Sequence, residues 1–225
     1  MKKAYFGLFI LLLPILVSCN EQKKFLALGN FNDETITNLK ALLNMDGNNY
    51  FVSENMQSGE LFKIVDSNAS YYENGKKHPF YVEASKAKLI LINVGLYDVI
   101  PSMEIKEDEN ILNYDDNLLN KQLEVFSYHM YHIIEEVRSI NNKADIFVLS
   151  AYNIFNFEKP EEKLFNNIVK EVNDSINDSI KDFDNIKYIS LVDMKNQLKE
   201  DASLTPNLLL ADIIRSHYNE WCRNK

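Results

Sequence analysis

The feature that most constrains the fold is an uninterrupted apolar run in the middle of the chain, Lys88–Gly95, with the sequence KLILINVG. A strand with one face in water alternates apolar and polar residues, whereas a strand covered on both faces is apolar throughout. The run therefore predicts a central strand of a parallel sheet that has helices on both faces. Four further apolar runs predict the other strands: Lys24–Gly29, Tyr50–Val52, Ala144–Ser150 and Lys187–Ser190.

Helical periodicity is found between these runs. From Asp115 to Ile140, apolar residues recur at steps of three and four, which is the spacing of one helix face. Strands that alternate with helices predict an α/β fold, namely a three-layer α/β/α sandwich with a mostly parallel five-stranded sheet. The same spacing predicts helices at 35–43, 60–65, 160–183 and 207–221, and polar composition predicts solvated loops at 67–77 and 104–116.

Composition excludes several classes of function. The 225 residues include 24 basic and 33 acidic side chains, a formal charge of −9. Nucleic-acid binding depends on clustered Lys and Arg, so we expect no nucleic-acid partner. Two cysteines cannot form a four-thiolate zinc site, and the sequence contains no HExxH, P-loop or GxGxxG motif. We therefore expect neither a metal nor a cofactor.

The N-terminus has the pattern of an export signal. Lys2 and Lys3 precede the apolar segment Ala4–Val17, which at about 14 residues is too short to span a bilayer. The segment ends in Leu-Val-Ser-Cys, which resembles the lipobox of bacterial lipoproteins and implies a lipid on Cys19. The alternative is an ordinary secretory signal with an incidental cysteine.

The lipobox interpretation divides the chain into a signal peptide (1–18), a lipidated tether (19–23) and a domain (24–225). It predicts a protein of the bacterial cell envelope. The expected location is the extracytoplasmic face of the cell membrane, with the lipid on Cys19 as the anchor.

Ligands of open parallel sheets bind at the carboxyl ends of the strands. Residues at those positions resemble the SGNH (GDSL-type) hydrolases, particularly the extracellular lipase or acylhydrolase-like lipoproteins of low-GC bacteria. The resemblance spans residues 25–221 and predicts the SGNH-hydrolase/flavodoxin-like form of the sandwich. It is carried by four blocks and a secondary signature: Leu26–Phe31, Val52–Asn55, Val94–Asp98, Ala202–Asn207 and Ala151–Phe155.

The resemblance also implies that the catalytic positions are degenerate. Asn30-Phe31 stands in place of the Asp-Ser of the first block, so that Phe31 replaces the nucleophile. Glu54 and Tyr97 replace the glycine and asparagine of the oxyanion hole, and Thr205 and Ala202 replace the histidine and its aspartate. What remains is the scaffold of the motifs: Gly29, Gly95, Asp98, Pro206 and Asn207.

These replacements remove the chemistry of ester hydrolysis. A phenyl ring cannot attack a carbonyl, threonine is no base near neutral pH, and a carboxylate opposes a developing oxyanion. We therefore expect a pseudoenzyme without catalytic residues, which acts as a binding or interaction module. Its expected partners are the membrane, through Cys19, and a protein, glycan or lipid ligand at the former cleft.

Two alternatives remain open. A divergent esterase or carbohydrate deacetylase with relocated residues predicts a Ser or Thr within hydrogen-bond reach of a His at the carboxyl ends of the strands. A solute-binding lipoprotein predicts an open pocket between four residues: Phe31, Glu54, Tyr97 and Thr205.

The other candidate groups have ordinary structural interpretations. Ser53 adjoins the second block, but no histidine is near it in sequence. His129 and His132 lie one helical turn apart, and we expect satisfied or half-exposed side chains rather than a metal site. His217 is expected to lie too far from the strand ends to act as a base, and His78 is expected in a polar loop.

Overall fold

The computed structural model describes residues 23–201 and 203–225. Its centre is a sheet of five strands in the order β2-β1-β5-β8-β9, and every neighbouring pair is parallel. This arrangement confirms the predicted parallel sheet. The strands are β1 (Lys24–Gly29), β2 (Asp46–Val52), β5 (Leu89–Asn93), β8 (Asp145–Leu149) and β9 (Ile186–Ile189).

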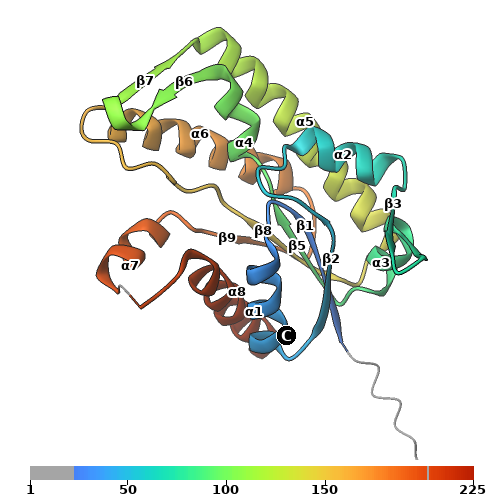
Figure 1. Ribbon diagram of the computed structural model, residues 1–225. Helices are drawn as coiled ribbons and strands as arrows, with labels where there is room; N and C mark the ends of the chain where they lie inside the picture. The colour runs from blue at the N-terminus through green and yellow to red at the C-terminus, as the bar shows by residue number, and fades with distance from the viewer. Residues whose placement is uncertain (1–22, 202) are drawn as a thin grey trace, which may run out of the picture.

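Helices cover both faces of the sheet, and Figure 1 shows the two layers on opposite sides. The first layer comprises α2 (Ser58–Asp66), α3 (Phe80–Lys86), α4 (Leu96–Val99), α5 (Asp116–Ile140) and α6 (Glu161–Ile180). The second comprises α1 (Asp33–Leu43), α7 (Met194–Glu200) and α8 (Pro206–Arg223). The predicted three-layer α/β/α sandwich is therefore confirmed.

The residues of β5 explain why this strand is apolar throughout. Ile90 and Ile92 belong to the apolar cluster under α2, α5 and α6, whereas Leu89 and Leu91 belong to the cluster under α1 and α8. All four side chains are fully buried. Because successive side chains of a strand point to opposite faces, both faces must be apolar when both are covered.

Helix α5 follows the predicted stripe. Its N-cap is Asp115, whose carboxylate accepts hydrogen bonds from the backbone N–H groups of Asn117 at 2.8 Å and Leu118 at 3.0 Å. Such a cap satisfies two backbone donors that the first helical turn leaves free. The stripe residues buried against the sheet include Leu119, Phe126, Met130, Ile133 and Val137.

The two polar segments predicted as loops are β-hairpins, so that prediction was wrong. The first hairpin turns at Asn74-Gly75, which both have positive φ, the Asn-Gly signature of a two-residue turn. Their strands lie outside the main sheet, and those of the first hairpin carry mostly exposed side chains. In the second hairpin Leu112 is buried and Met103, Ile105 and Tyr114 are half-buried against the first apolar cluster, so the apolar–polar alternation of Met103–Lys106 was an available signal. The elements are β3 (Ser70–Glu73), β4 (Lys76–Pro79), β6 (Met103–Lys106) and β7 (Ile111–Tyr114), with 3-10 turns η1 (Ile100–Ser102) and η2 (Glu107–Glu109).

His78 also differs from its prediction. It lies in β4 rather than in a loop and is only 7% exposed. Its Nδ1 is 3.0 Å from a carboxylate oxygen of Glu83 on α3. The hydrogen bond to this carboxylate explains how the hairpin can bury an imidazole.

Some predictions lie outside the described residues. Cys19, the signal segment 1–18 and Ala202 are among the positions not described. Within the described residues, no helix is both long enough and apolar enough to cross a membrane. The described residues form two apolar clusters, one on each face of the five-stranded sheet.

Candidate functional site

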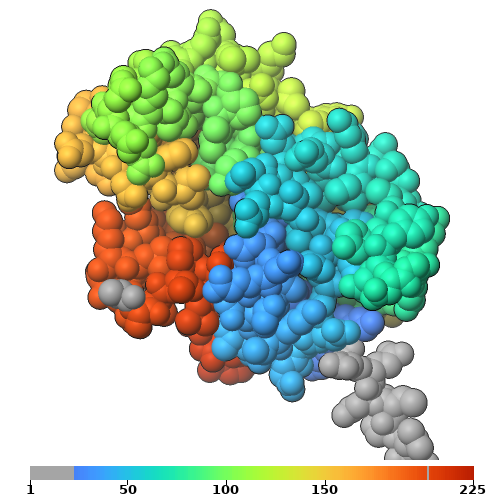
Figure 2. All heavy atoms as spheres, viewed as in Figure 1, coloured from blue at the N-terminus to red at the C-terminus, as the bar shows by residue number. Residues whose placement is uncertain are grey.

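A hollow of about 250 Å³ lies where the carboxyl ends of β1, β2, β5 and β8 meet. The sheet order reverses between β1 and β5, and such a switch point is where open α/β sheets bind ligands. In Figure 2 the segments that surround the hollow, coloured blue, cyan, green and orange, meet near the middle of the view. We call this hollow the cleft; its lining residues include Asn30, Phe31, Thr35, Glu54, Asn93, Tyr97, Tyr152 and Asn207.

Phe31 lies at the end of β1, at the position predicted for the degenerate nucleophile. Its ring is 3% exposed and belongs to the apolar cluster under α1 and α8, so it borders the cleft without filling it. The turn before it is tied to β5: Asn30 N–H donates to the Asn93 carbonyl and Asn93 Nδ2 donates to the Asn30 carbonyl, both at 2.7 Å. The backbone N–H of Asn55 donates to Asn30 Oδ1 at 2.9 Å.

The titratable groups of the described lining are two phenols and one carboxylate. Burial, and secondarily the charge of Glu54, raises the pKa of Tyr97. Burial, and secondarily Tyr97, raises the pKa of Tyr152. Both phenols therefore keep their protons near neutral pH and can donate hydrogen bonds. The described lining contains no Lys, Arg or His side chain, so the charge of the cleft is negative.

Asn207 occupies the place expected for Thr205 in the cleft. Its Oδ1 accepts hydrogen bonds from Asn32 Nδ2 at 3.0 Å and from Thr35 Oγ1 at 3.1 Å, and its Nδ2 donates to Glu34 Oε2 at 2.7 Å. Thr205 is exposed and is not part of the lining. Its hydroxyl instead accepts from the Leu208 N–H as the N-cap of α8. The expected pocket thus exists, but three of its four predicted residues line it.

Beside the cleft, the retained Asp98 forms a buried hydrogen-bond chain. Its carboxylate accepts the backbone N–H of Ser58 at 2.9 Å and the Ser58 hydroxyl at 2.5 Å. Ser58 Oγ lies 3.0 Å from Nδ1 of His129 on α5. Burial lowers the pKa of His129, with smaller contributions from Lys63 and His132.

The hydrogen bonds of Asp98, Ser58 and His129 include the hydroxyl–histidine pair that the divergent-esterase alternative predicts, but the pair lies in an unsuitable place. Ser58 is fully buried, and neither Ser58 nor His129 lines the cleft. The serine also stands between the carboxylate and the imidazole, whereas a catalytic triad has the imidazole in the middle. The arrangement is suited to holding α2 against α4.

The remaining candidates lie away from the cleft. Ser53 is exposed and is not part of the lining. His132 contacts Glu135 at 3.0 Å on α5, and His217 lies on α8, 3.8 Å from Glu220. No group of three or more His, Cys, Asp or Glu side chains that could hold a metal ion occurs in the described ranges.

Several lining residues were missed by sequence reasoning, namely Asn32, Thr35, Asn55 and Asn93. Asn93 ends β5, so its position at the carboxyl end of a strand was an available signal. The Ser58–His129 contact joins residues 71 positions apart, and no motif links them.

Comparisons with known proteins agree with this geometry. No protein-family model and no curated protein sequence matches the chain. Among solved structures, a lipase (Lip_vut3) from a goat rumen metagenome has a TM-score of 0.61 at 17% identity, covering 86% of this chain and 96% of that one. A GDSL-like lipase from Bacteroides thetaiotaomicron has a TM-score of 0.55 at 15% identity, covering 91% and 89%.

A third similar structure is a family two carbohydrate esterase from Clostridium thermocellum in complex with cellohexaose. Its TM-score is 0.55 at 13% identity, and the match covers 89% of this chain and 64% of that one. At these identities the likeness concerns the fold. The parallel sheet, its two helical layers and its structural neighbours together identify the fold of this chain as that of the SGNH (GDSL-type) hydrolases.

Proposed function

We propose that the chain is an extracytoplasmic bacterial lipoprotein, anchored through Cys19, whose SGNH-like domain binds a ligand in the cleft and does not catalyse. The observation that carries the proposal is the lining of the cleft. It has the packed ring of Phe31 at the end of β1, the carboxylate of Glu54, and no histidine among its described residues.

Hydrolysis requires a nucleophile that the substrate can reach and a base beside it. Ser58 has the base but is fully buried, and its hydroxyl already contacts the Asp98 carboxylate. Of the two aliphatic hydroxyls in the lining, that of Thr35 contacts two asparagine side chains and that of Ser150 accepts the Leu191 N–H at 2.7 Å. These contacts support a binding function rather than a relocated active site.

The charge of the cleft favours a neutral polar ligand. A carboxylate without a neighbouring cation repels anions such as fatty acids, while the hydroxyls of a sugar can donate to Glu54 and accept from Tyr97 and Tyr152. At about 250 Å³ the hollow is smaller than usual ligand pockets of about 300–1,000 Å³, which suits a single sugar unit. We therefore propose a glycan as the ligand; the named cellohexaose complex is consistent with that choice.

The cleft is tested with the segment 23–225 and its Tyr97→Ala variant. We expect the segment to bind members of a glycan array. Calorimetry with the glycan that binds most strongly should then show that Tyr97→Ala lowers the affinity about tenfold or more, which corresponds to one good hydrogen bond. Tyr128→Ala removes an exposed tyrosine of α5 that is outside the lining, and should leave affinity unchanged.

The same samples test catalysis. We expect p-nitrophenyl acetate and butyrate to be hydrolysed no faster than in buffer. Hydrolysis well above background that survives Ser53→Ala but is lost in Ser58→Ala would instead establish the divergent-esterase alternative with a relocated nucleophile.

The anchor is tested with the full chain expressed in a bacterial host. We expect incorporation of radiolabelled palmitate and partitioning into the detergent phase, both abolished by Cys19→Ser, because only a thiol at this position can accept the lipid. Cys222→Ser removes the only other cysteine and serves as the control, with label retained. Label that persists in Cys19→Ser would refute lipidation at this site.

A further inference from the structure

The two edges of the parallel sheet differ in charge. Segments that follow the carboxyl ends of the strands, around the cleft, are rich in carboxylates. Segments at the amino ends carry many lysines, interspersed with the carboxylates of Asp46, Asp66, Glu83, Asp145 and Asp184. The acidic set includes Glu54, Glu104, Glu107, Asp108, Glu109, Asp115, Asp116, Glu158, Glu161 and Glu162, and the basic set includes Lys23, Lys24, Lys40, Lys63, Lys86, Lys88, Lys143 and Lys225.

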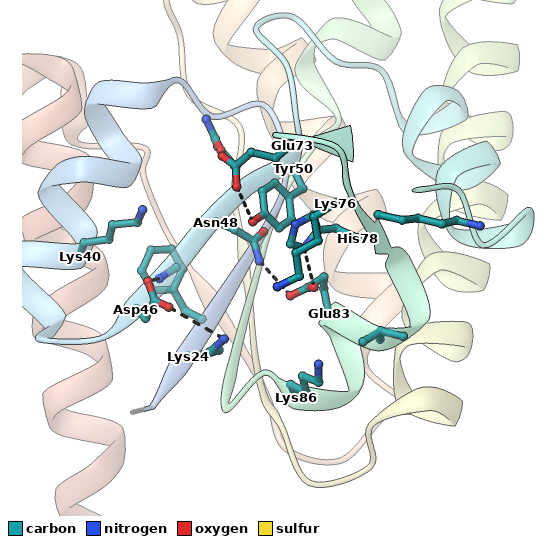
Figure 3. A pocket seen from close by; sticks show the side chains of 15 residues that line it. Lys24, Lys40, Asp46, Asn48, Tyr50, Glu73, Lys76, His78, Glu83 and Lys86 are labelled. Atoms are coloured by element: carbon teal, nitrogen blue, oxygen red, sulfur yellow. Dashed lines mark hydrogen bonds and ion pairs between the residues drawn. The ribbon is translucent and has the colours of Figure 1, made fainter. Parts of the chain in front are cut away.

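Near the amino edge lies a second hollow of about 410 Å³, between the edge strand β2, the β3–β4 hairpin and α3. Lysines from four different elements line it: Lys24 of β1, Lys40 of α1, Lys76 of β4 and Lys86 of α3. Figure 3 shows Lys24, Lys76 and Lys86 around Asn48 and Glu83, with Lys24 next to Asp46 and Lys40 on the neighbouring helix. We call this site the lysine hollow.

The carboxylates of the lysine hollow already have partners. Glu83 contacts His78 at 3.0 Å and accepts from Asn48 Nδ2 at 3.4 Å. Glu73 accepts the Tyr50 hydroxyl at 3.1 Å, and Asp46 lies 3.9 Å from Lys24.

Three of the lysines remain available. Lys40, Lys76 and Lys86 have no carboxylate within 4.0 Å in the part of the chain that the structure describes. The lining holds five lysines, the fifth being Lys77, against the three carboxylates of Asp46, Glu73 and Glu83, so its net charge is positive. Ammonium groups in such excess favour an anion that has several oxygens, such as a phosphate group.

The lysine hollow is also at the point where the chain enters the domain. Lys24 is the first residue of β1 and follows Cys19 by five positions. Even fully extended, five residues span at most about 18 Å. A lipid on Cys19 would therefore hold the amino edge close to the headgroups of the bilayer.

We infer that the amino edge of the sheet is a face that lies on an anionic lipid surface, with headgroup phosphates in the lysine hollow. The proximity of the bilayer rests on the proposed anchor at Cys19, whereas the charge and shape of the face do not depend on that anchor. The cleft, at the opposite edge, is then turned away from the membrane and toward ligands in the surrounding medium.

The net negative charge of the protein does not oppose this orientation. The strands of five or six residues separate the two edges by roughly 17–20 Å, at about 3.3 Å per residue. The Debye length at physiological ionic strength is about 8 Å, so the acidic edge is screened from a surface that touches the basic edge.

The experiment uses the segment 23–225, which lacks Cys19, and measures its sedimentation with vesicles. We expect binding to vesicles of phosphatidylglycerol mixed with phosphatidylcholine, no binding to phosphatidylcholine alone, and weaker binding as salt is raised. The double variant Lys76→Gln/Lys86→Gln should lower the partition coefficient about tenfold or more, since each lysine near an anionic surface contributes measurably.

A charge-matched control is Lys121→Gln/Lys163→Gln, which removes two exposed lysines, one from the second turn of α5 and one from the first turn of α6, near the acidic edge. It should change binding less than about twofold. Circular dichroism establishes that each variant is folded.

Three results would overturn the inference: no binding to the anionic vesicles, an equal loss in both double variants, or binding of inorganic phosphate by calorimetry without vesicle binding. The last would assign the lysine hollow to a soluble phosphate compound. Because the segment carries no lipid, these outcomes are independent of whether Cys19 is lipidated.

Discussion

Asp98 is a buried carboxyl group that connects the cleft to the helix layer above it. It directly follows Tyr97 of the cleft, is 8% exposed, and holds the first residue of α2 through two bonds to Ser58. Burial raises its pKa to about 6, although the hydrogen bonds from Ser58 and Gly95 act in the opposite direction. The protonation state of Asp98 therefore affects the bonds that hold α2 next to Tyr97 of the cleft.

The stability of the protein should depend on pH through Asp98. Because the folded-state pKa is above the ordinary 3.8, the native state holds this proton to higher pH than the unfolded chain does. The contribution of Asp98 is therefore largest below pH 4 and decreases as pH rises to about 6, by an amount on the order of 2–3 kcal/mol. In urea unfolding, the free energy of unfolding of the unmodified chain should fall relative to that of Asp98→Asn as pH rises from about 4 to 6.

Asp108→Asn provides the control, because it removes a carboxylate that is exposed on η2. It should follow the pH dependence of the unmodified chain. Parallel curves for the unmodified chain and Asp98→Asn would contradict the assignment of a raised pKa to Asp98.

At the scale of the elements, the junction between β1 and α1 is the most constrained part of the cleft. Gly29 has a φ of +97°, and a Cβ at this position would lie 2.2 Å from the Asn93 carbonyl oxygen. The backbone of β1 thus approaches β5 as closely as a glycine allows. This contact positions Phe31 at the border of the cleft.

Gly29→Ala should accordingly destabilise the fold by about 3 kcal/mol or more, from left-handed strain together with a backbone clash. Gly75→Ala is a matched control, because Gly75 has a φ of +75° but a Cβ there would meet nothing within 4 Å. The left-handed backbone alone predicts a loss of stability of about 1–2 kcal/mol for Gly75→Ala. Equal losses in urea unfolding would show that close approach to Asn93 is unimportant.

At the scale of the whole molecule, the sheet joins two apolar clusters into one structure. Phe126 of α5 is fully buried in the first cluster, whereas Phe147 of β8 belongs to the second. Trp221, the only tryptophan, packs on Phe147 with ring centroids 6.0 Å apart. Its fluorescence therefore reports on the layer of α8.

This arrangement predicts cooperative unfolding across both layers. Phe126→Ala should lower stability by about 3–5 kcal/mol through the cavity it creates. Since the five parallel strands form one sheet between the two helical layers, the Trp221 fluorescence midpoint in urea should fall together with the circular-dichroism midpoint. A fluorescence midpoint that stays in place while the dichroism midpoint falls would indicate that the two layers unfold independently.

The elements predicted correctly from sequence are those whose burial leaves a pattern in the chain. Lys88–Gly95 is apolar because both faces of β5 are covered, and the stripe of α5 repeats because one helix face meets the sheet. The hairpin β3–β4 is mostly exposed, so burial leaves little pattern there. The hairpin β6–β7 packs Met103, Ile105, Leu112 and Tyr114 on the first cluster, but its strands of four residues are too short to give a clear repeat. Only the Asn74-Gly75 turn marked the first of them.

The candidate site was predictable in location but not in composition. The carboxyl ends of parallel strands must share one edge, so Phe31, Glu54 and Tyr97 could be placed together from the order of the strands. Thr205 and Asn207 are two positions apart, which on a helix start separates them by more than half a turn. Which of them reached the cleft depended on the orientation of α8.

The parallel sheet, its two helical layers and the edge that holds the cleft could all be predicted from the order of residues, because buried positions recur with the period of a strand or a helix. Tertiary structure alone decided that Asn207 rather than Thr205 lines the cleft, and that Ser58 meets His129 and Asp98. It also decided that lysines of four elements converge at the opposite edge. These contacts join residues far apart in sequence, and their geometry depends on how helices pack on the sheet rather than on any local pattern.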